Sequence, residues 1–393
     1  MPPCLRQSHG LRRLALLLAA AIALPAAAEE PSPLADDAAR MLADIRTLAS
    51  PEMGGRDPDE GKSAAWVAER MEAIGLEPLF DGDYRQPIPG GKVPLTGANV
   101  GGFVRGGDPE VADEWVLITA HHDHLGQRGE RLFAGADDNA SGTAMVLEAA
   151  RRLVADAERG IRPRRSVALV CFDLEEHMLW GSRWFVSHAP MELGSIRLFI
   201  TADMIGRRLG DLDGIDEVFV MGTESAAGLG SIVRRSAERA GQPLAVLGTD
   251  IVGTRSDYGP FKWKRVPFLF FSTGEHNDYH TPRDVPAKID AARAARIKDV
   301  VLATALEAAS SDEPPTWSPQ PPDALAEAAA LNRIATLVLD EHAETGQTLS
   351  LVEQLLVERM KTETAAAIEA GQVTPRQRTW LVNGARAMLL TVF

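Results

Sequence analysis

Short apolar runs of strand length alternate along the chain with longer segments in which apolar residues recur at helical spacing. The run 167–172 is entirely apolar. It is too short to span a membrane, so it predicts a strand of a parallel sheet that is buried on both faces. Similar runs predict further strands at 100–104, 115–120, 198–204, 218–221 and 266–271.

Helical spacing marks the segments between these strands. In the segment 140–154, two rows of apolar residues together form a stripe that is wide enough to pack on a sheet. The other predicted helices cover 33–49, 63–74, 182–187, 226–240 and 287–309, and a connection rich in proline and glycine covers 82–97. Alternating strands and helices predict the α/β class, as a three-layer sandwich with a mixed, centrally parallel sheet.

The chain changes character after residue 312. Residues 313–322, EPPTWSPQPP, predict a proline-rich linker between the main domain, 29–312, and the C-terminal segment. That segment, 323–393, predicts a helical appendage with helices at 324–344, 349–370 and 375–392. The appendage is either a docking element, through which the chain forms a homo-oligomer, or an extension that packs on the main domain.

The first 28 residues have the pattern of a secretory signal peptide. A basic start with three arginines precedes an apolar stretch at 14–24, and the alanines at 26–28 form an A-x-A cleavage site. The apolar stretch is too short to remain as a membrane anchor. We therefore expect residues 1–28 to be removed and the mature protein to be exported, periplasmic or secreted, without a membrane span.

The composition narrows the range of partners. The formal net charge is −14 at pH 7, and the signal segment carries three arginines and no acid, so the mature chain is more acidic still. Such a chain is not expected to bind nucleic acid. Cys171 is the only cysteine beyond the signal segment, which excludes an intramolecular disulfide and indicates a small core residue.

Acids and histidines gather directly after the predicted strands or in the loops between them. These groups lie at 121–124, 135–142, 173–176, 203 and 280–284. A buried strand that ends in adjacent carboxylates is costly unless metal ions or other partners neutralise them. Ligands collect beyond the carboxyl ends of strands in open α/β sheets, so we expect these groups to converge on one site.

Six motifs between about residues 40 and 310 carry a resemblance to a known family. They are HHDHLG, GADDNASGTA, DLEEHMLWGS, TADMIG, RSDYGPF and GEHNDYHTPRD. In this order they resemble the motif set of the co-catalytic di-zinc aminopeptidase family, which also contains glutamate carboxypeptidases and glutaminyl cyclases. The helical appendage has no counterpart in this resemblance.

The resemblance implies two Zn²⁺ per chain and a set of ligands for them. Asp138, the second acid of GADDNASG, would bridge both ions. His121 and Asp203 would complete one site, and Glu176 and His280 would complete the other. The three carboxylates and two neutral imidazoles carry a total charge of about −3, which nearly neutralises the two ions. An open position remains for a shared water.

The resemblance also implies the catalytic groups. Glu175 would be the general base, because it is adjacent to a ligand but points to the other side. It would take a proton from the metal-bridging water and pass it to the leaving amine. Asp123 follows His121 by two residues, and on a strand both would share a face. Asp123 would then accept the second N–H of that imidazole and fix its tautomer.

Three further positions carry open expectations. Tyr258 in RSDYGPF would donate a hydrogen bond to the oxyanion or form a wall of the pocket. Met178 stands where the family commonly has a glycine, which affects the expected shape of the pocket. Asp137 is expected to cap its loop. Four other histidines are expected beside the site or in loops, and not as ligands: His122, His124, His177 and His276.

The implied activity is removal of N-terminal residues from peptides that have a free N-terminus. A carboxypeptidase or dipeptidase would use the same two ions. A cyclase is less favoured, because that branch typically works with one zinc ion. A non-catalytic binding module that kept the fold would have lost ligands, whereas every expected ligand and the base are present in this chain.

Overall fold

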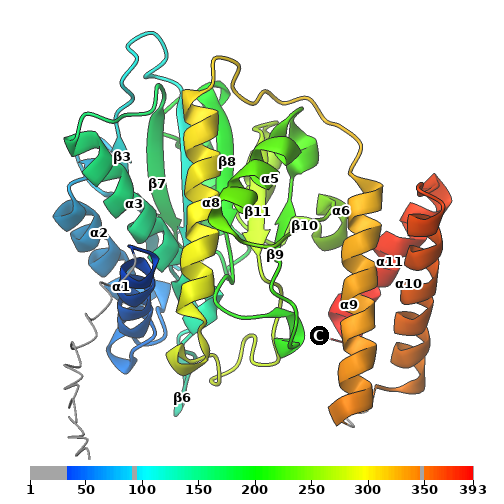
Figure 1. The fold of residues 1–393 in the computed structure, drawn as a ribbon. Helices are drawn as coiled ribbons and strands as arrows, with labels where there is room; N and C mark the ends of the chain where they lie inside the picture. The colour runs from blue at the N-terminus through cyan, green and yellow to red at the C-terminus, as the bar shows by residue number, and fades with distance from the viewer. Residues whose placement is uncertain (1–32, 91–94, 346–348, 393) are drawn as a thin grey trace, which may run out of the picture.

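A mixed sheet of nine strands forms the centre of the computed structural model, which describes residues 33–90, 95–345 and 349–392. The strands follow the spatial order β1-β3-β7-β4-β8-β11-β9-β10, with β2 beside β3. Figure 1 labels β3, β7, β8, β11, β9 and β10 of this sheet. Their bounds are β1 Glu77–Pro78, β2 Arg85–Ile88, β3 Gly97–Val104, β4 Trp115–His121, β7 Ser166–Phe172, β8 Ile196–Ala202, β9 Val218–Met221, β10 Leu244–Val246 and β11 Phe268–Ser272. A separate hairpin consists of β5 Gln127–Arg128 and β6 Arg131–Leu132.

The four central strands run parallel. β4 pairs in parallel with β7 and β8, and β8 pairs in parallel with β11. The outer strands β3 and β9 run antiparallel to their central neighbours. The predicted mixed, centrally parallel sheet is therefore confirmed. Because β4, β7 and β8 point the same way, the residues after their carboxyl ends lie at one edge of the sheet.

Alternate residues of the strands face two separate cores. On β7, Val167, Leu169 and Cys171 face one core, whereas Ala168 and Phe172 face the other. Helices α1 Pro33–Leu48, α2 Lys62–Ile74, α3 Gly142–Glu158, α5 Leu229–Ala240 and α8 Ala291–Ser310 cover the first face. Helices α4 Trp180–Ser187, α6 Thr249–Val252 and α7 Tyr258–Trp263 cover the second face. This arrangement confirms the three-layer sandwich and the core position of Cys171.

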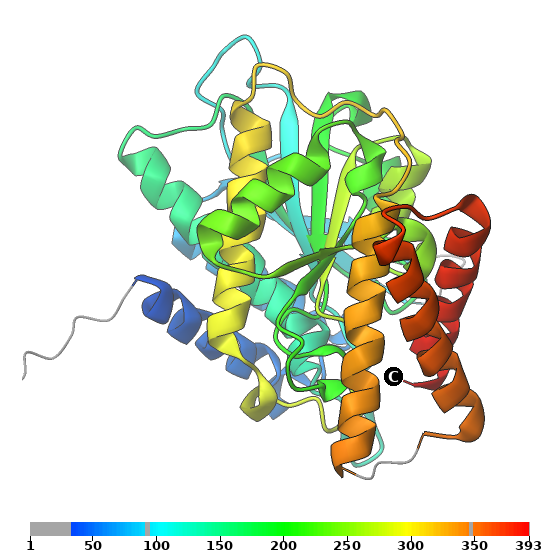
Figure 2. The same ribbon diagram turned by 45° about the vertical axis from the view of Figure 1, so that its right-hand side comes forward.

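The C-terminal helices pack against the same second face. They are α9 Ala324–Thr345, α10 Leu351–Glu369 and α11 Pro375–Thr391, and they lie beside β10 and α6 in Figures 1 and 2. Leu331 and Met388 belong to the same core as Phe219 of β9. The appendage is therefore a packed extension of the main domain. A homo-oligomer through these helices stays a prediction.

The Arg378 guanidinium of α11 fixes this packing. It donates to both carboxylate oxygens of Asp250 in α6, at 2.7 and 2.8 Å. It also donates to the Glu327 carboxylate of α9 at 3.1 Å, and that carboxylate accepts the Gly248 backbone N–H at 3.0 Å. A bidentate guanidinium–carboxylate pair sets orientation as well as contact. The three elements are thus held in one relative orientation.

Two predictions from the sequence pattern were wrong in detail. The connection 82–97 contains β2, a four-residue edge strand whose alternate residues are buried and which pairs with β3. The strand was missed because Pro87 lies within it and proline usually argues against a strand, although proline is tolerated on edge strands. The strand expected at 198–204 ends at Ala202, so Asp203 belongs to the loop after the strand.

The predicted signal peptide, residues 1–28, lies outside the described residues. Within the part of the chain that the structure describes, no helix has both the length and the apolar character that crossing a membrane requires.

Candidate metal centre

Five side chains meet at the carboxyl edge of the sheet in two adjoining groups. In the first, Nε2 of His121 lies 3.4 Å from Oδ1 of Asp138 and 3.4 Å from Oδ1 of Asp203. In the second, Nε2 of His280 lies 3.1 Å from Oδ2 of Asp138 and 3.2 Å from Oε2 of Glu176. Asp138 thus presents one carboxylate oxygen to each group. The structure brings together all five residues that the sequence predicted as ligands, in the predicted pairing.

The polar atoms of these groups suit a metal ion. Among the described residues, Oδ2 of Asp138 and Oδ1 of Asp203 are buried without a hydrogen-bond donor. Buried carboxylate oxygens are costly in that state, and coordination to a cation removes the cost. Nitrogen and oxygen donors in groups of three fit the open coordination of a catalytic divalent ion such as zinc. The residues present therefore fit a pair of ions.

The charges of the site point the same way. Burial opposes a positive charge on His280, yet Asp138 and Glu176 outweigh it and raise the pKa of His280 to about 10. Burial likewise opposes the charged form of His121, but Glu175 and Asp203 raise its pKa well above the ordinary value. Protons and metal ions compete for the same atoms, so metal binding would displace the protons held by these imidazoles.

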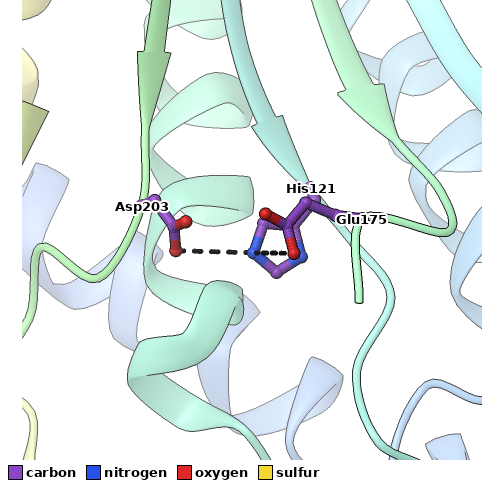
Figure 3. A group of neighbouring side chains, drawn as sticks. All are labelled: His121, Glu175 and Asp203. Carbon is purple, nitrogen blue, oxygen red and sulfur yellow. Dashed lines mark ion pairs between the residues drawn. The ribbon is translucent and has the colours of Figure 1, made fainter. Parts of the chain in front are cut away.

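Glu175 stands beside the first group. Its Oε2 lies 4.0 Å from Nε2 of His121, and its side chain is 10% exposed. Figure 3 shows Glu175 and Asp203 approaching the same imidazole, one from the loop after β7 and the other from the loop after β8. Burial raises the pKa of Glu175 well above its ordinary value, and Asp203 adds to the effect while His121 opposes it. Glu175 lies close enough to His121 and Asp203 to hold an ion with them, whereas Glu176 faces the second group. The assignment of Glu175 as base and not as ligand stays a prediction.

Asp123 contacts three residues of the site. Oδ1 of Asp123 accepts the Glu175 backbone N–H at 3.1 Å, and Oδ2 accepts the Glu176 N–H at 3.2 Å. Oδ1 also lies 3.5 Å from Nδ1 of His121. The expected orientation toward the imidazole is present, but its stated reason was wrong. β4 ends at His121, so the loop and not a shared strand face places Asp123. Its hydrogen bonds instead hold the Glu175–Glu176 backbone.

Two more acids tie the remaining loops together. The Asp284 carboxylate accepts the backbone N–H groups of Asp137, at 3.0 Å, and of Asp138, at 3.1 Å. Oδ1 of Asp137 in turn accepts the Gly206 N–H at 2.6 Å, in the loop that carries Asp203. Asp137 therefore links two ligand loops, which goes beyond the loop cap expected for it. Burial, with a contribution from Asp284, raises the pKa of Asp137 to about 8.

Arg56 braces the site, and the sequence pattern gave no sign of it. Its guanidinium is fully buried, and all five of its N–H groups donate to backbone carbonyls. The acceptors, at 2.7 to 3.2 Å, are Leu48, His122, Ala134, Gly135 and Asp138. Arg56 thus joins the end of α1, the loop after β4 and the loop that carries the shared carboxylate.

Arg56→Lys is expected to weaken Zn²⁺ binding by about 10- to 100-fold, as loss of groups that orient metal ligands does. Lysine keeps the charge but offers three donors in place of five, so at least two of the carbonyl contacts are lost. Competition with a chromophoric chelator measures the affinity. Arg152→Lys, at a side chain that is 59% exposed, is the matched control. Unchanged Zn²⁺ affinity in Arg56→Lys would show that the brace does not act on the site.

His124 lies closer to the ligands than the sequence indicated. Its Nδ1 lies 2.9 Å from Oε1 of Glu176 and 3.8 Å from Oδ2 of Asp138, within the second group. Among the described residues its Nε2 has no hydrogen-bond partner. The position of His124 directly after Asp123 was the one feature of the sequence that pointed to the site. Because loops have no regular periodicity, the direction of its side chain could not be predicted. By contrast, the ring nitrogens of His122 contact the Ser63 hydroxyl and the Ala98 carbonyl and none of the five proposed ligands.

Tyr258 requires a correction. Its ring is fully buried and stacks on Phe268 with 5.1 Å between ring centroids. Its hydroxyl donates to the Gly253 carbonyl at 2.8 Å. The phenol proton is already used inside the fold, so the expected hydrogen bond from Tyr258 to an oxyanion does not fit this position. The first residue of α7 points into the core because the helix packs its apolar side on β11.

The backbone of Met178 lies in a region that favours glycine. Its φ is +65°, in the left-handed region, and Leu179 comes next at +59°. A residue with a Cβ is strained there, which explains why glycine suits the position. The Met178 side chain is 74% exposed, so most of it faces solvent.

A third cluster of possible ligands is already neutralised. Asp211, His276 and Asp278 lie close enough together to hold an ion. The Asp278 carboxylate, however, pairs with Arg207 at 2.9 Å, with Arg283 at 2.7 Å and with Lys288. These three cationic side chains neutralise the negative charge that would otherwise attract a metal ion. The cluster is therefore a network of ion pairs.

Comparison with known proteins places this geometry in a family context. A model of peptidase family M28 matches residues 99–305, a little over half of the chain. The protein named aminopeptidase YwaD from Bacillus subtilis is 27% identical over 208 residues, which are 51% of this chain and 42% of that protein. Leupeptin-inactivating enzyme 1 from Streptomyces exfoliatus is 29% identical over 283 residues, 65% of this chain and 57% of that protein.

The chain therefore spans about half the length of these curated relatives. Among solved structures, BSAP, a zinc aminopeptidase from Bacillus subtilis, aligns with a TM-score of 0.56 at 19% identity. The alignment covers 70% of this chain and 96% of that one. At this identity the likeness concerns the fold, and it agrees with the sandwich described above.

Proposed function

The chain belongs to peptidase family M28, and from this premise we propose that it is a zinc aminopeptidase that releases N-terminal residues from peptides with a free N-terminus. Membership of the family supports a metal-dependent peptidase. The names of the two Bacillus subtilis proteins, aminopeptidase YwaD and the zinc aminopeptidase BSAP, favour the aminopeptidase activity.

One observation carries the proposal: the carboxylate of Asp138 turns one oxygen to His121 and the other to His280. We propose that it bridges two Zn²⁺ ions, with Asp203 completing the first site and Glu176 the second. When bound, the ions supply Lewis acidity, which polarises the scissile carbonyl and makes water nucleophilic near neutral pH.

Glu175 has the position of the general base. Glu175 lies beside the first group and not in the second. Burial raises the pKa of its carboxyl well above the ordinary value. A base of this kind takes a proton from the attacking water and passes it to the leaving amine. Asp123 keeps Glu175 in place through the backbone N–H, so orientation of the base does not depend on the side chain alone.

A carboxypeptidase or dipeptidase is the second candidate, because a salt bridge between two side chains beside the site offers groups that could bind either terminus of a peptide. Arg255 lies 2.8 Å from Glu275, and both line the cavity that begins at Asp203. A guanidinium recognises a terminal carboxylate, whereas a carboxylate recognises a terminal ammonium. The Arg255–Glu275 pair therefore does not distinguish an enzyme that binds the N-terminus of its substrate from one that binds the C-terminus, and an experiment is needed.

A panel of free and blocked peptides tests the direction and the metal together. We expect N-acetylation to abolish cleavage of a test peptide, and C-terminal amidation to leave cleavage intact. A chelator should remove activity and added Zn²⁺ should restore it, with about two zinc ions per active chain. Cleavage of the acetylated but not the amidated peptide would establish the carboxypeptidase instead. Full activity in metal-free protein would overturn the metal dependence.

A further inference from the structure

A cavity of about 120 Å³ begins at Asp203 and extends away from the metal centre. Its mouth is polar, with Asp203, Arg255 and Glu275. Its walls are apolar and include Phe219 and Phe270 from the adjoining strands β9 and β11. The cavity therefore joins the proposed catalytic centre to the second core of the sandwich.

The C-terminal helices close the far end of this cavity. Leu331 and Ile334 of α9 and Ala385 and Met388 of α11 all belong to its wall. Their exposed fractions are between 2% and 6%, so they are fixed parts of the core and not mobile surface side chains. The helices are themselves held to α6 by the Arg378–Asp250 pair. The depth of the cavity is thus set by a part of the chain that contributes none of the proposed ligands.

We propose, on the basis of the aminopeptidase function proposed above, that α9 and α11 set the length of the N-terminal side chain that the enzyme accepts. The carbonyl to be cleaved must reach the ions beside Asp203, and the side chain of the same residue is one carbon away from it. The cavity is the apolar space that begins at that point.

The size and the lining of the cavity define the substrate class. An apolar cavity of about 150 Å³ holds a benzene molecule. This cavity, at about 120 Å³ and with a polar mouth, has the size of a single medium-sized side chain. A charged side chain would lose its hydration in the apolar end without gaining a partner. The preferred N-terminal residues are therefore leucine, methionine and phenylalanine, over alanine, lysine and glutamate.

Two opposite changes in α11 test the assignment. Ala385→Leu fills the far end, and Met388→Ala deepens it. A removed or added methylene group changes discrimination by about 10- to 200-fold. Ala385→Leu should therefore lower kcat/KM for a phenylalanyl substrate at least tenfold relative to an alanyl substrate. Met388→Ala should raise the ratio of tryptophanyl to leucyl cleavage by a similar factor.

Val382→Ala is the matched control, because Val382 is a buried residue of the same helix and core. It should leave both ratios within about twofold of the wild type, and thermal melting reports whether each variant is folded. A wild type that cleaves the panel while neither ratio moves in the folded variants overturns the role of the helices alone. A wild type that cleaves no substrate with a free N-terminus overturns the proposed function and this inference together.

Discussion

Glu175→Gln is expected to lower kcat by about 10²- to 10⁴-fold, the usual contribution of a positioned acid or base. Glutamine has nearly the same shape as glutamate but cannot accept and return a proton. The backbone N–H of this position would still donate to Asp123. The loop and the neighbouring Glu176 should therefore stay in place, and the variant should bind its full complement of metal. Steady-state kinetics together with metal analysis of the purified variant measure both effects.

The neighbouring residue supplies the control. Glu176→Gln should lower metal content as well as activity, since Oε2 of Glu176 lies 3.2 Å from Nε2 of His280 in the second group. Distance alone does not separate a base from a ligand at Glu175, which lies 4.0 Å from Nε2 of His121. Loss of metal from Glu175→Gln would identify Glu175 as a ligand. Near-normal kcat in the metal-loaded variant would remove it from the mechanism.

Asp138→Asn is expected to have the other large effect. An amide carries no negative charge and offers one oxygen where the carboxylate offers two, whereas Asp138 faces His121 with one oxygen and His280 with the other. The variant should lose at least one of about two zinc ions. Its kcat/KM should fall by at least about 10³-fold, because the charge that stabilises the transition state goes with the metal.

Asp137→Asn is the matched control for this experiment. The Asp137 carboxylate accepts the Gly206 N–H and is not among the predicted ligands, so its charge is not expected to be needed for holding the ions. An amide oxygen can accept the Gly206 N–H as the carboxyl oxygen does. Metal content should therefore be unchanged in Asp137→Asn. Retention of two zinc ions by Asp138→Asn would show that Asp138 does not bridge them.

The ligands were predictable because they follow directly after strands, and both the strands and their arrangement in the sheet can be predicted from the sequence. A buried apolar run predicts a strand, and the parallel arrangement brings the ends of such strands to one edge. His121, Glu176 and Asp203 follow from this logic, and the motif resemblance separates their roles. The direction of a side chain beyond the strand does not follow from it. This is why Asp123 contacts the Glu175–Glu176 backbone in addition to facing His121.

Other parts of the site have no signature in the sequence. The partners of Arg56 are backbone carbonyls, which every residue type provides equally, so no motif announces them. The side of the sheet on which the C-terminal helices pack depends on shape and on one ion-pair cluster around Arg378. The inward direction of Tyr258 depends on how α7 packs on β11. These features come from tertiary packing, which local propensity does not encode.

The native contacts of Arg56 also lead to an expectation about the order of events during folding. Its most distant hydrogen-bond acceptor lies 82 residues further along the chain, and the proposed ligands extend to His280. Such long-range contacts form only after the entropy of closing large loops has been overcome. In the native chain Arg56 joins the end of α1 to the loop that carries Asp138, so we expect the ligands to come together only after this contact has formed. Metal uptake is therefore expected to be a late event that completes a nearly native chain.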